Sequence, residues 1–160
     1  MDSSNVRLAQ PEDRAKIIEL TKELHGENGL FSMSDKKVRA MLDRFYNREG
    51  AVIGVIGPVG DPVATIYLGI DQMSYSDDWA LVEQWNFVHP EHRKSNYASQ
   101  LICYAKRLAD EFKLPLLVGI LSNSRTEAKA RLYERHLHKA GLYFIYNLDA
   151  LEHSAPAWHE

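Results

Sequence analysis

The chain has 160 residues, of which 45% are hydrophobic and 26% are charged, and its formal net charge is -3. This length and balance predict a single domain over residues 1–160, with its core over about 6–148 and a short tail over 149–160. The acidic net charge argues against general binding to nucleic acid or to an anionic membrane. No apolar run approaches the roughly 18–20 residues of a spanning helix, and MDSSNVRLAQ lacks the apolar core of a signal peptide. We therefore expect a cytoplasmic protein.

The N-terminal half predicts a short strand, two helices and a hairpin. The strand at Val6–Leu8 precedes a helix that starts near Pro11 and ends at about Leu24, before the glycines of HGENG. Ser34 caps a second helix, predicted over Asp35–Arg48. Two apolar runs joined by the turn GPVGDP then predict the strands of a hairpin, Ala51–Ile56 and Val63 to about Ile70.

The C-terminal half predicts alternating strands and helices. A third apolar run, Trp79–Val88, leads through the basic loop HPEHRKSN into an amphipathic helix over Tyr97–Lys113. A strand over Leu116–Leu121, a helix over about Thr126–Ala140 and a last strand over Leu142–Leu148 follow. The order β-α-α-β-β-β-α-β-α-β predicts an α/β fold with a mixed sheet and helices on both faces.

The basic loop places Arg93, Lys94 and Ser95 beside the amides that open the next helix. About four backbone N–H groups lack acceptors at a helix N-terminus, which also carries partial positive charge and so suits an anion. The pattern Arg93-x-x-Asn96-x-Ala98 resembles the Arg/Gln-x-x-Gly-x-Gly/Ala signature of the GNAT acyltransferases, which hold the pyrophosphate of acetyl-coenzyme A. Asn96 stands where the family usually has glycine. Asparagine tolerates positive φ better than other side-chain-bearing residues, and its side chain would either crowd the phosphate or hydrogen-bond to it.

The resemblance covers most of the chain, from about Val6 to Tyr146. It implies a GNAT-type acyl-CoA N-acyltransferase fold, whose central mixed, mostly antiparallel sheet has helices on both faces. It also implies acetyl-CoA as the acyl donor, with the pantetheine arm in a gap beside the strand that precedes the basic loop. The cofactor-binding residues that it implies are Phe87, Val88, Arg93, Lys94, Ser95, Asn96, Tyr97, Ala98 and Asn123. Asn123 fits equally well as a capping residue of its own loop.

Tyr133 is the candidate general acid. It lies in the segment RLYE, which resembles the family's Leu-Tyr-Glu segment, where the tyrosine hydroxyl sits beside the coenzyme sulfur. A tyrosine with a pKa of about 10 is protonated at neutral pH and can give its proton to a departing thiolate. Tyr97 and Tyr104 are alternatives, and a tyrosine packed on the core is the non-catalytic interpretation. The run from Tyr133 to Gly141 is about one helical turn longer than is usual in the family.

Glu83 is the candidate general base. It lies on the strand before the basic loop, where several members of the family carry a carboxylate. The period of two in a strand predicts that Glu83 shares a face with Trp85 and Phe87. Aromatic neighbours would raise the pKa of the carboxyl and make it a better base. A solvent-facing or ion-paired strand acid is the alternative interpretation.

Two sets of loop residues are candidates for the acceptor site. The aromatic and sulfur-containing side chains are Phe31, Met33, Tyr75 and Trp79, which would line a cleft or cover the core. The acidic side chains, which would suit a cationic amine, are Glu27, Asp71, Asp77 and Asp78.

Other catalytic patterns are missing from the sequence. The seven histidines show no HExxH or comparable spacing, and there is no P-loop lysine or Rossmann glycine triplet. We therefore expect no metal site and no covalent enzyme intermediate. The resemblance implies an N-acetyltransferase that transfers an acetyl group from acetyl-CoA to a primary amine, on a small molecule or a protein, by direct attack on the thioester. The alternative is a catalytically decayed domain of the same fold that binds a protein or forms a homodimer.

Overall fold

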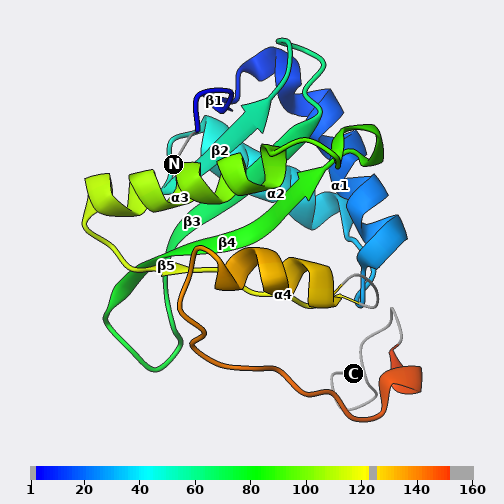
Figure 1. Cartoon of the computed structure of the whole chain (residues 1–160), viewed down its shortest axis with the longest axis vertical. Coiled ribbons are helices and arrows are strands. Elements are labelled where there is room, and N and C mark those ends of the chain that lie inside the picture. The colour runs from blue at the N-terminus through cyan, green and yellow to red at the C-terminus, as the bar shows by residue number, and fades with distance from the viewer. Residues whose placement is uncertain (1–2, 123–125, 152–160) are drawn as a thin grey trace.

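A five-stranded sheet forms the centre of the computed structural model, which describes residues 3–122 and 126–151 (Figure 1). In the order in which they lie side by side, the strands are β1 (Arg7–Leu8), β2 (Ala51–Ile56), β3 (Ala64–Gln72), β4 (Trp79–Val88) and β5 (Leu116–Leu117). The first four strands pair antiparallel, and β5 pairs parallel with β4. The predicted mixed, mostly antiparallel sheet and its hairpin are confirmed.

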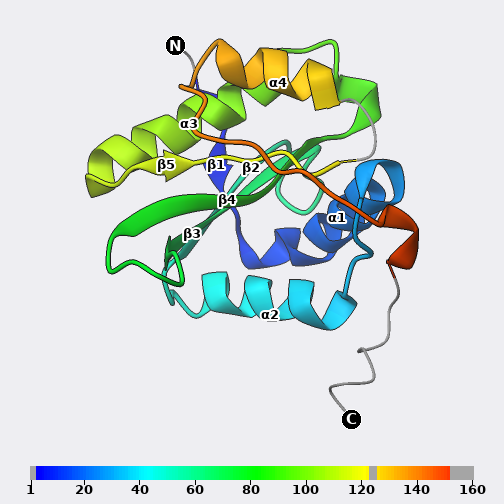
Figure 2. The same cartoon turned by 90° about the horizontal axis from the view of Figure 1, so that it is seen from below.

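Helices cover both faces of this sheet, as the sequence predicts. Within the described ranges they are α1 (Arg14–Asn28), α2 (Asp35–Tyr46), α3 (Tyr97–Phe112) and α4 (Thr126–Glu134). Single 3-10 turns lie at Pro11–Asp13, Pro90–His92 and Leu148–Ala150. Figure 2 shows α1 and α2 below the sheet and α3 and α4 above it. None of the helices in these ranges is long and apolar enough to cross a membrane.

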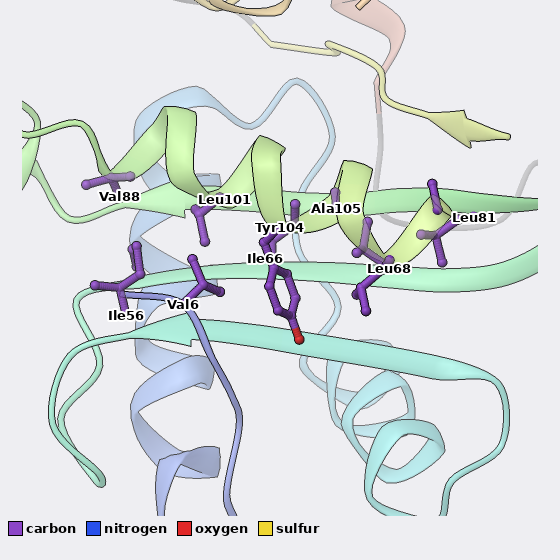
Figure 3. Close-up of a cluster of buried hydrophobic side chains, with 12 residues drawn as sticks. Val6, Ile56, Ile66, Leu68, Leu81, Val88, Leu101, Tyr104 and Ala105 are labelled. Atoms are coloured by element: carbon purple, nitrogen blue, oxygen red, sulfur yellow. The ribbon is translucent and has the colours of Figure 1, made fainter. Parts of the chain in front are cut away.

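The core between α3 and the sheet is close-packed (Figure 3). Leu101 and Tyr104 of α3 pack there against Ile66 and Leu81 of the strands, and all four side chains are buried. Gly54 on β2 makes room for this packing, because a Cβ there would come within 2.8 Å of the Tyr104 ring. Each fully buried side chain of this size contributes about 1.5–3 kcal/mol to folding. α3 is therefore fixed firmly on the sheet.

A second core lies between the sheet and the helices α1 and α2. Ile17 of α1 and Leu42 of α2 are fully buried there beside Tyr67 and Trp85 of the strands. The Tyr67 and Trp85 rings lie 4.7 Å apart between centroids. This core holds the other face of β4, so the strand that carries the candidate base is packed on both sides.

The first helix is longer than predicted. It continues past Leu24 and Gly26 to Asn28. Two side chains of its last turns contact the basic loop: a Glu23 carboxylate oxygen lies 3.4 Å from His89 Nε2, and Glu27 forms an ion pair with Arg93 at 2.6 Å. These tertiary contacts outweigh the helix-ending tendency of the glycine.

The C-terminal third departs most from prediction. The strand predicted to reach Leu121 pairs only over β5, and the helix predicted to reach Ala140 ends at Glu134. The predicted last strand, Leu142–Leu148, is wrong: these residues form no ladder with the sheet. Phe144 and Tyr146 are 89% and 94% exposed. An apolar run indicates a tendency toward extended backbone, but it does not specify the sheet edge with which it would pair. Without that pairing the run does not form a strand.

Candidate active site

β4 and β5 separate shortly after they pair. Their ladder consists of Leu81 with Leu116 and Val82 with Leu117, so the second half of β4 continues beyond it. The cleft that follows has a volume of about 130 Å³. It is lined by the end of β4, the basic loop, the start of α3 and one side of α4: Asn86, Phe87, Val88, His92, Arg93, Ser95, Ala98, Ala128, Lys129 and Leu132. The cleft lies beside the end of β4, where the resemblance implies a gap for the pantetheine arm.

A bulge interrupts β4 at the mouth of this gap. Trp85 pairs with Tyr67 of β3, whereas Glu83 pairs with the next β3 residue, Leu68, so Gln84 is an extra residue. An extra residue in one strand of an antiparallel pair reverses the alternation of its side chains beyond that point.

The bulge decides which side chains share a face. Leu81, before the bulge, packs in the core under α3, whereas Trp85, after it, packs in the core over α1 and α2. The prediction that Glu83 shares a face with Trp85 and Phe87 is therefore wrong, because a period of two does not continue through a bulge. Instead, Glu83 and Asn86 lie on one face, toward α4.

Glu83, Asn86 and Tyr133 form one hydrogen-bonded cluster. The Asn86 side-chain amide donates to Glu83 Oε2 at 2.5 Å and to the Tyr133 hydroxyl oxygen at 2.7 Å. Tyr133 is the one buried residue among the nine of α4. The two predicted catalytic residues thus meet through a third that sequence reasoning missed. The available signal was a polar side chain within the apolar run LVEQWNFV, three residues after the acid.

The surroundings of this cluster raise the pKa of both Glu83 and Tyr133. Burial raises the pKa of Glu83 to about 7, although the hydrogen bond from Asn86 and the charge of Lys129 oppose the shift. Burial, with the nearby Glu83 carboxylate, raises the pKa of the Tyr133 hydroxyl well above its ordinary value. Near neutral pH this carboxyl can gain or lose a proton while the phenol keeps its own.

Arg93 connects the basic loop with two other elements. Its guanidinium meets both carboxylate oxygens of Glu27 on α1 at 2.6 Å. Its Nε donates to the Val88 carbonyl at 3.3 Å, and its charge lies 5.5 Å from the centre of the Phe87 ring. Bidentate pairing of this kind fixes a guanidinium firmly. Arg93 therefore braces the loop against α1 and the end of β4.

The start of α3 shows how asparagine is accommodated at the unusual position. Asn96 is the residue before the helix and has a φ of -92°, so positive φ is not required there. Its Oδ1 accepts from the side chain of Gln100 at 2.7 Å, along the flank of the helix. The first intrahelical bond runs from the Gln100 amide to the Asn96 carbonyl. The amides of Ala98 and Ser99 therefore lie in the opening turn, where no intrahelical acceptor exists.

Solved structures with the same arrangement of elements exist at low sequence identity, although no family model and no curated protein matches the sequence. The structure of AAC(6')-Iy with the bisubstrate analogue CoA-S-monomethyl-acetylneamine has a TM-score of 0.70 at 14% identity, covering 89% of this chain and 95% of that one. The chain has the GNAT-type acyltransferase fold. An integron cassette protein from the mobile metagenome of Cole Harbour Salt Marsh has a TM-score of 0.69 at 20% identity, covering 99% of this chain and 95% of that one. A ribosomal-protein-alanine N-acetyltransferase from Brucella melitensis biovar Abortus 2308 has a TM-score of 0.64 at 18% identity, covering 88% of this chain and 95% of that one.

The remaining predicted residues take separate places on this GNAT-type fold. Ser95 donates its hydroxyl to the His92 carbonyl and accepts from the Tyr97 amide, so it caps the loop. Tyr97 stacks on the His92 ring, with 6.0 Å between centroids, and Lys94 is exposed. Tyr104, the other tyrosine considered for the acid, is buried in the core under α3. Asn123 lies outside the described residues.

A second hollow of about 890 Å³ lies where α1 leads into α2. It is lined by His25, Gly29, Leu30, Phe31, Ser32, Met33, Ser34, Lys37 and Leu151. Among these described residues none is acidic. Of the acids predicted for a cationic acceptor, Glu27 pairs with Arg93 and Asp71 pairs with Arg44 at 3.1 Å. Among the described ranges, no group of three or more histidine, cysteine or acidic side chains is placed to hold a metal.

Proposed function

We propose that this protein is an N-acetyltransferase that transfers an acetyl group from acetyl-CoA to a primary amine. One observation carries the proposal: a single cleft beside the end of β4 reaches both a cluster of polar side chains and the opening turn of α3. Asn86, hydrogen-bonded to Glu83 and Tyr133, lies at one part of its lining, and Ala98, in the opening turn of α3, lies at another. A helix N-terminus that suits an anion, with an acid–base pair one hydrogen bond behind the same cleft, suits a thioester with a phosphorylated carrier.

The acid–base pair would serve both proton transfers of the reaction. Glu83, with a pKa of about 7, accepts the proton that the amine loses as its nitrogen bonds to the thioester carbonyl carbon. The carbon–sulfur bond then breaks, and Tyr133 gives its hydroxyl proton to the departing sulfur. The raised pKa of Tyr133 keeps that proton on the phenol at neutral pH. No covalent bond to the enzyme is required.

The loop side of the cleft would hold the phosphates. The amides of the first turn of α3 supply donors and partial positive charge, and Ala98 presents only a methyl group where the phosphate approaches. The exposed Lys94 adds a cation. Arg93, held by Glu27, keeps the loop in place while it faces the cleft.

The acceptor is proposed to be a primary amine on a small molecule or a protein chain. Of the neighbours named above, AAC(6')-Iy is an aminoglycoside N-acetyltransferase and another is a ribosomal-protein-alanine N-acetyltransferase, which supports screening both classes of amine. A hollow lined by Phe31 and Met33, with no acidic side chain among its described lining residues, favours an acceptor with an apolar part over a polycation.

Thermal unfolding with acetyl-CoA, desulfo-CoA and ATP tests the donor site. A ligand at about 100 times its Kd stabilises the fold by about 2.7 kcal/mol, so we expect both coenzymes to raise the midpoint clearly. Ala98→Asp places bulk and negative charge in the phosphate site and should abolish the rise. Ala40→Asp, on the exposed face of α2, is the matched control and should retain it.

Acetyl transfer itself is measured as free thiol released from acetyl-CoA with a panel of amines. The expected result is amine-dependent thiol release that Glu83→Gln and Tyr133→Phe reduce strongly. The absence of both a midpoint rise and thiol release at millimolar acetyl-CoA would overturn the proposal.

A further inference from the structure

We propose that Asn86 is a positioning residue that aligns the acid–base pair by donating one amide hydrogen to Glu83 and the other to Tyr133. The inference rests on the proposed acetyl transfer and extends it to a residue outside the predicted catalytic pair. Both hydrogen bonds come from the same nitrogen, at 2.5 Å and 2.7 Å.

The chemistry of the amide fixes the direction of both bonds. An ionised carboxylate has no hydrogen to give, so the nitrogen of Asn86, rather than its oxygen, must face Glu83. The nitrogen carries two hydrogens and accepts none, so the Tyr133 oxygen accepts the second. The hydrogen of the Tyr133 hydroxyl is then left for another acceptor. Asn86 thereby directs the acid's proton away from itself and toward the cleft that its own side chain lines.

The same bond leaves half of the carboxylate available. Asn86 occupies Glu83 Oε2, and Oε1 is the oxygen that would receive the proton of the amine. Each bond also opposes the effect of burial, since the hydrogen bond from Asn86 lowers the pKa of Glu83 and of Tyr133. Without Asn86 both groups would hold their protons more tightly, and the base would work only at higher pH.

Asn86 is well suited to this role because it lies within the sheet. It pairs with Ile66 of β3, two positions beyond the bulge at Gln84. The bulge is what brings Asn86 to the face of Glu83, although they are three residues apart. A side chain on a paired strand is held more precisely than one on a loop.

The first test reads the carboxyl directly and needs no enzymatic activity. The ¹³C resonance of the Glu83 carboxyl, titrated by NMR, should have its midpoint at about pH 7 in the native chain. Asn86→Ala should move the midpoint to higher pH, and Asn86→Thr, which keeps one hydroxyl donor, should move it less. Asn47→Ala, an exposed asparagine after α2, should leave it unchanged. An unchanged midpoint in both Asn86 variants, each folded by circular dichroism, overturns the proposal.

The second test is kinetic. Losing a hydrogen bond to a charged group predicts a fall of about 10- to 100-fold in kcat for Asn86→Ala, with KM for acetyl-CoA changed less than about threefold. The acidic and the basic limbs of the pH profile should both move to higher pH. A fall in kcat with both limbs unmoved would reduce Asn86 to a structural role and overturn the inference. If the native chain transfers acetyl to no amine, the proposed function fails, and the NMR midpoints still decide whether Asn86 tunes Glu83.

Discussion

The two helices above the sheet are held in very different ways. α3 buries eight of its sixteen residues, among them Leu101 and Ala105, whereas α4 buries Tyr133 alone. The contrast extends beyond the helices: residues 142–148, which follow α4, expose a run of large apolar side chains. Burial of apolar area is what fixes one element on another. The proposed phosphate site therefore rests on a firm element, and the proposed acid, Tyr133, rests on a loosely attached one.

This difference matters for the proposed catalytic role of the cluster. In that proposal Tyr133 gives a proton to the leaving sulfur, which requires its hydroxyl to be held in a fixed place. α4 contributes little packing to that end, so the hydrogen bond from Asn86 of β4 at 2.7 Å carries much of the task. Elements with few buried contacts lie at the low end of local stability.

The largest expected effect is on the firmly held strand. Glu83→Gln should lower kcat/KM for the amine by about 10² to 10⁴-fold, because the base is lost while the shape is kept. In the native chain kcat/KM should fall on the acid side of about pH 7, where the carboxyl is protonated. The measurement is thiol release against pH. A variant that keeps native activity at every pH would show that another group takes the amine's proton.

Glu83→Gln also predicts a pH-dependent change in stability. The folded pKa of about 7 lies above the ordinary value of 4.5, so the folded state binds the proton more tightly. Stability from this group is thus present below about pH 4.5 and is lost as pH rises through about 7. The loss amounts to at most about 3.4 kcal/mol. Urea unfolding should find the variant more stable than the native chain at about pH 8, an advantage that shrinks toward pH 5.

The same substitution should affect stability very differently in the two regions. Leu101→Ala on α3 should lower the free energy of unfolding by about 2–5 kcal/mol, because it leaves a cavity in a close-packed core. Leu142→Ala, at a position 65% exposed, should lower it by less than about 0.5 kcal/mol. Urea denaturation of both variants gives the comparison. Equal losses would show that residues 142–148 are buried in solution and that the two regions do not differ in packing.

The strong and weak parts of the sequence prediction follow the same division. The run from Trp79 through the basic loop into α3 combines apolar periodicity, loop chemistry and a long amphipathic helix, and its bounds agree with the structure to within one residue. The same signals fail for Leu142–Leu148, because a strand depends on a partner that its own residues do not specify. Local sequence patterns therefore predict an element well where the element has a continuous apolar face of its own to bury.

Within the site, the sequence indicated the two ends of the cluster but not its centre. Glu83 and Tyr133 were found from residue type and from the resemblance. Asn86 was not, since the strand period assigns it to the opposite face and only the bulge at Gln84 reverses that. The pairing of Arg93 with Glu27 was equally hidden, because it joins residues 66 positions apart. Contacts between residues so far apart in the sequence depend on how the elements pack together, which no local sequence pattern specifies.

A smaller effect is expected from the proposed acid on α4. Tyr133→Phe should lower kcat by about 10²-fold at neutral pH, since the leaving sulfur loses its proton donor while the ring stays in place. The free energy of unfolding should fall by only about 1 kcal/mol, the value of one hydrogen bond. Tyr75→Phe, at a position 87% exposed, is the control and should change neither quantity. Full activity in Tyr133→Phe would assign the proton to water or to another side chain.

The smallest expected effect concerns the brace between α1 and the loop. Glu27→Gln removes one charge of a partly buried ion pair in which both oxygens lie 2.6 Å from Arg93. Such a pair contributes about 1 kcal/mol, so the Kd for acetyl-CoA should rise about fivefold as the loop loosens. Calorimetric titration measures this, with Asp35→Asn, which breaks the Asp35–Arg39 pair on α2, as the control that should leave Kd unchanged. Tighter binding in Glu27→Gln would instead show that Glu27 restrains Arg93 from the phosphates, and the guanidinium would then act as a ligand of the anion.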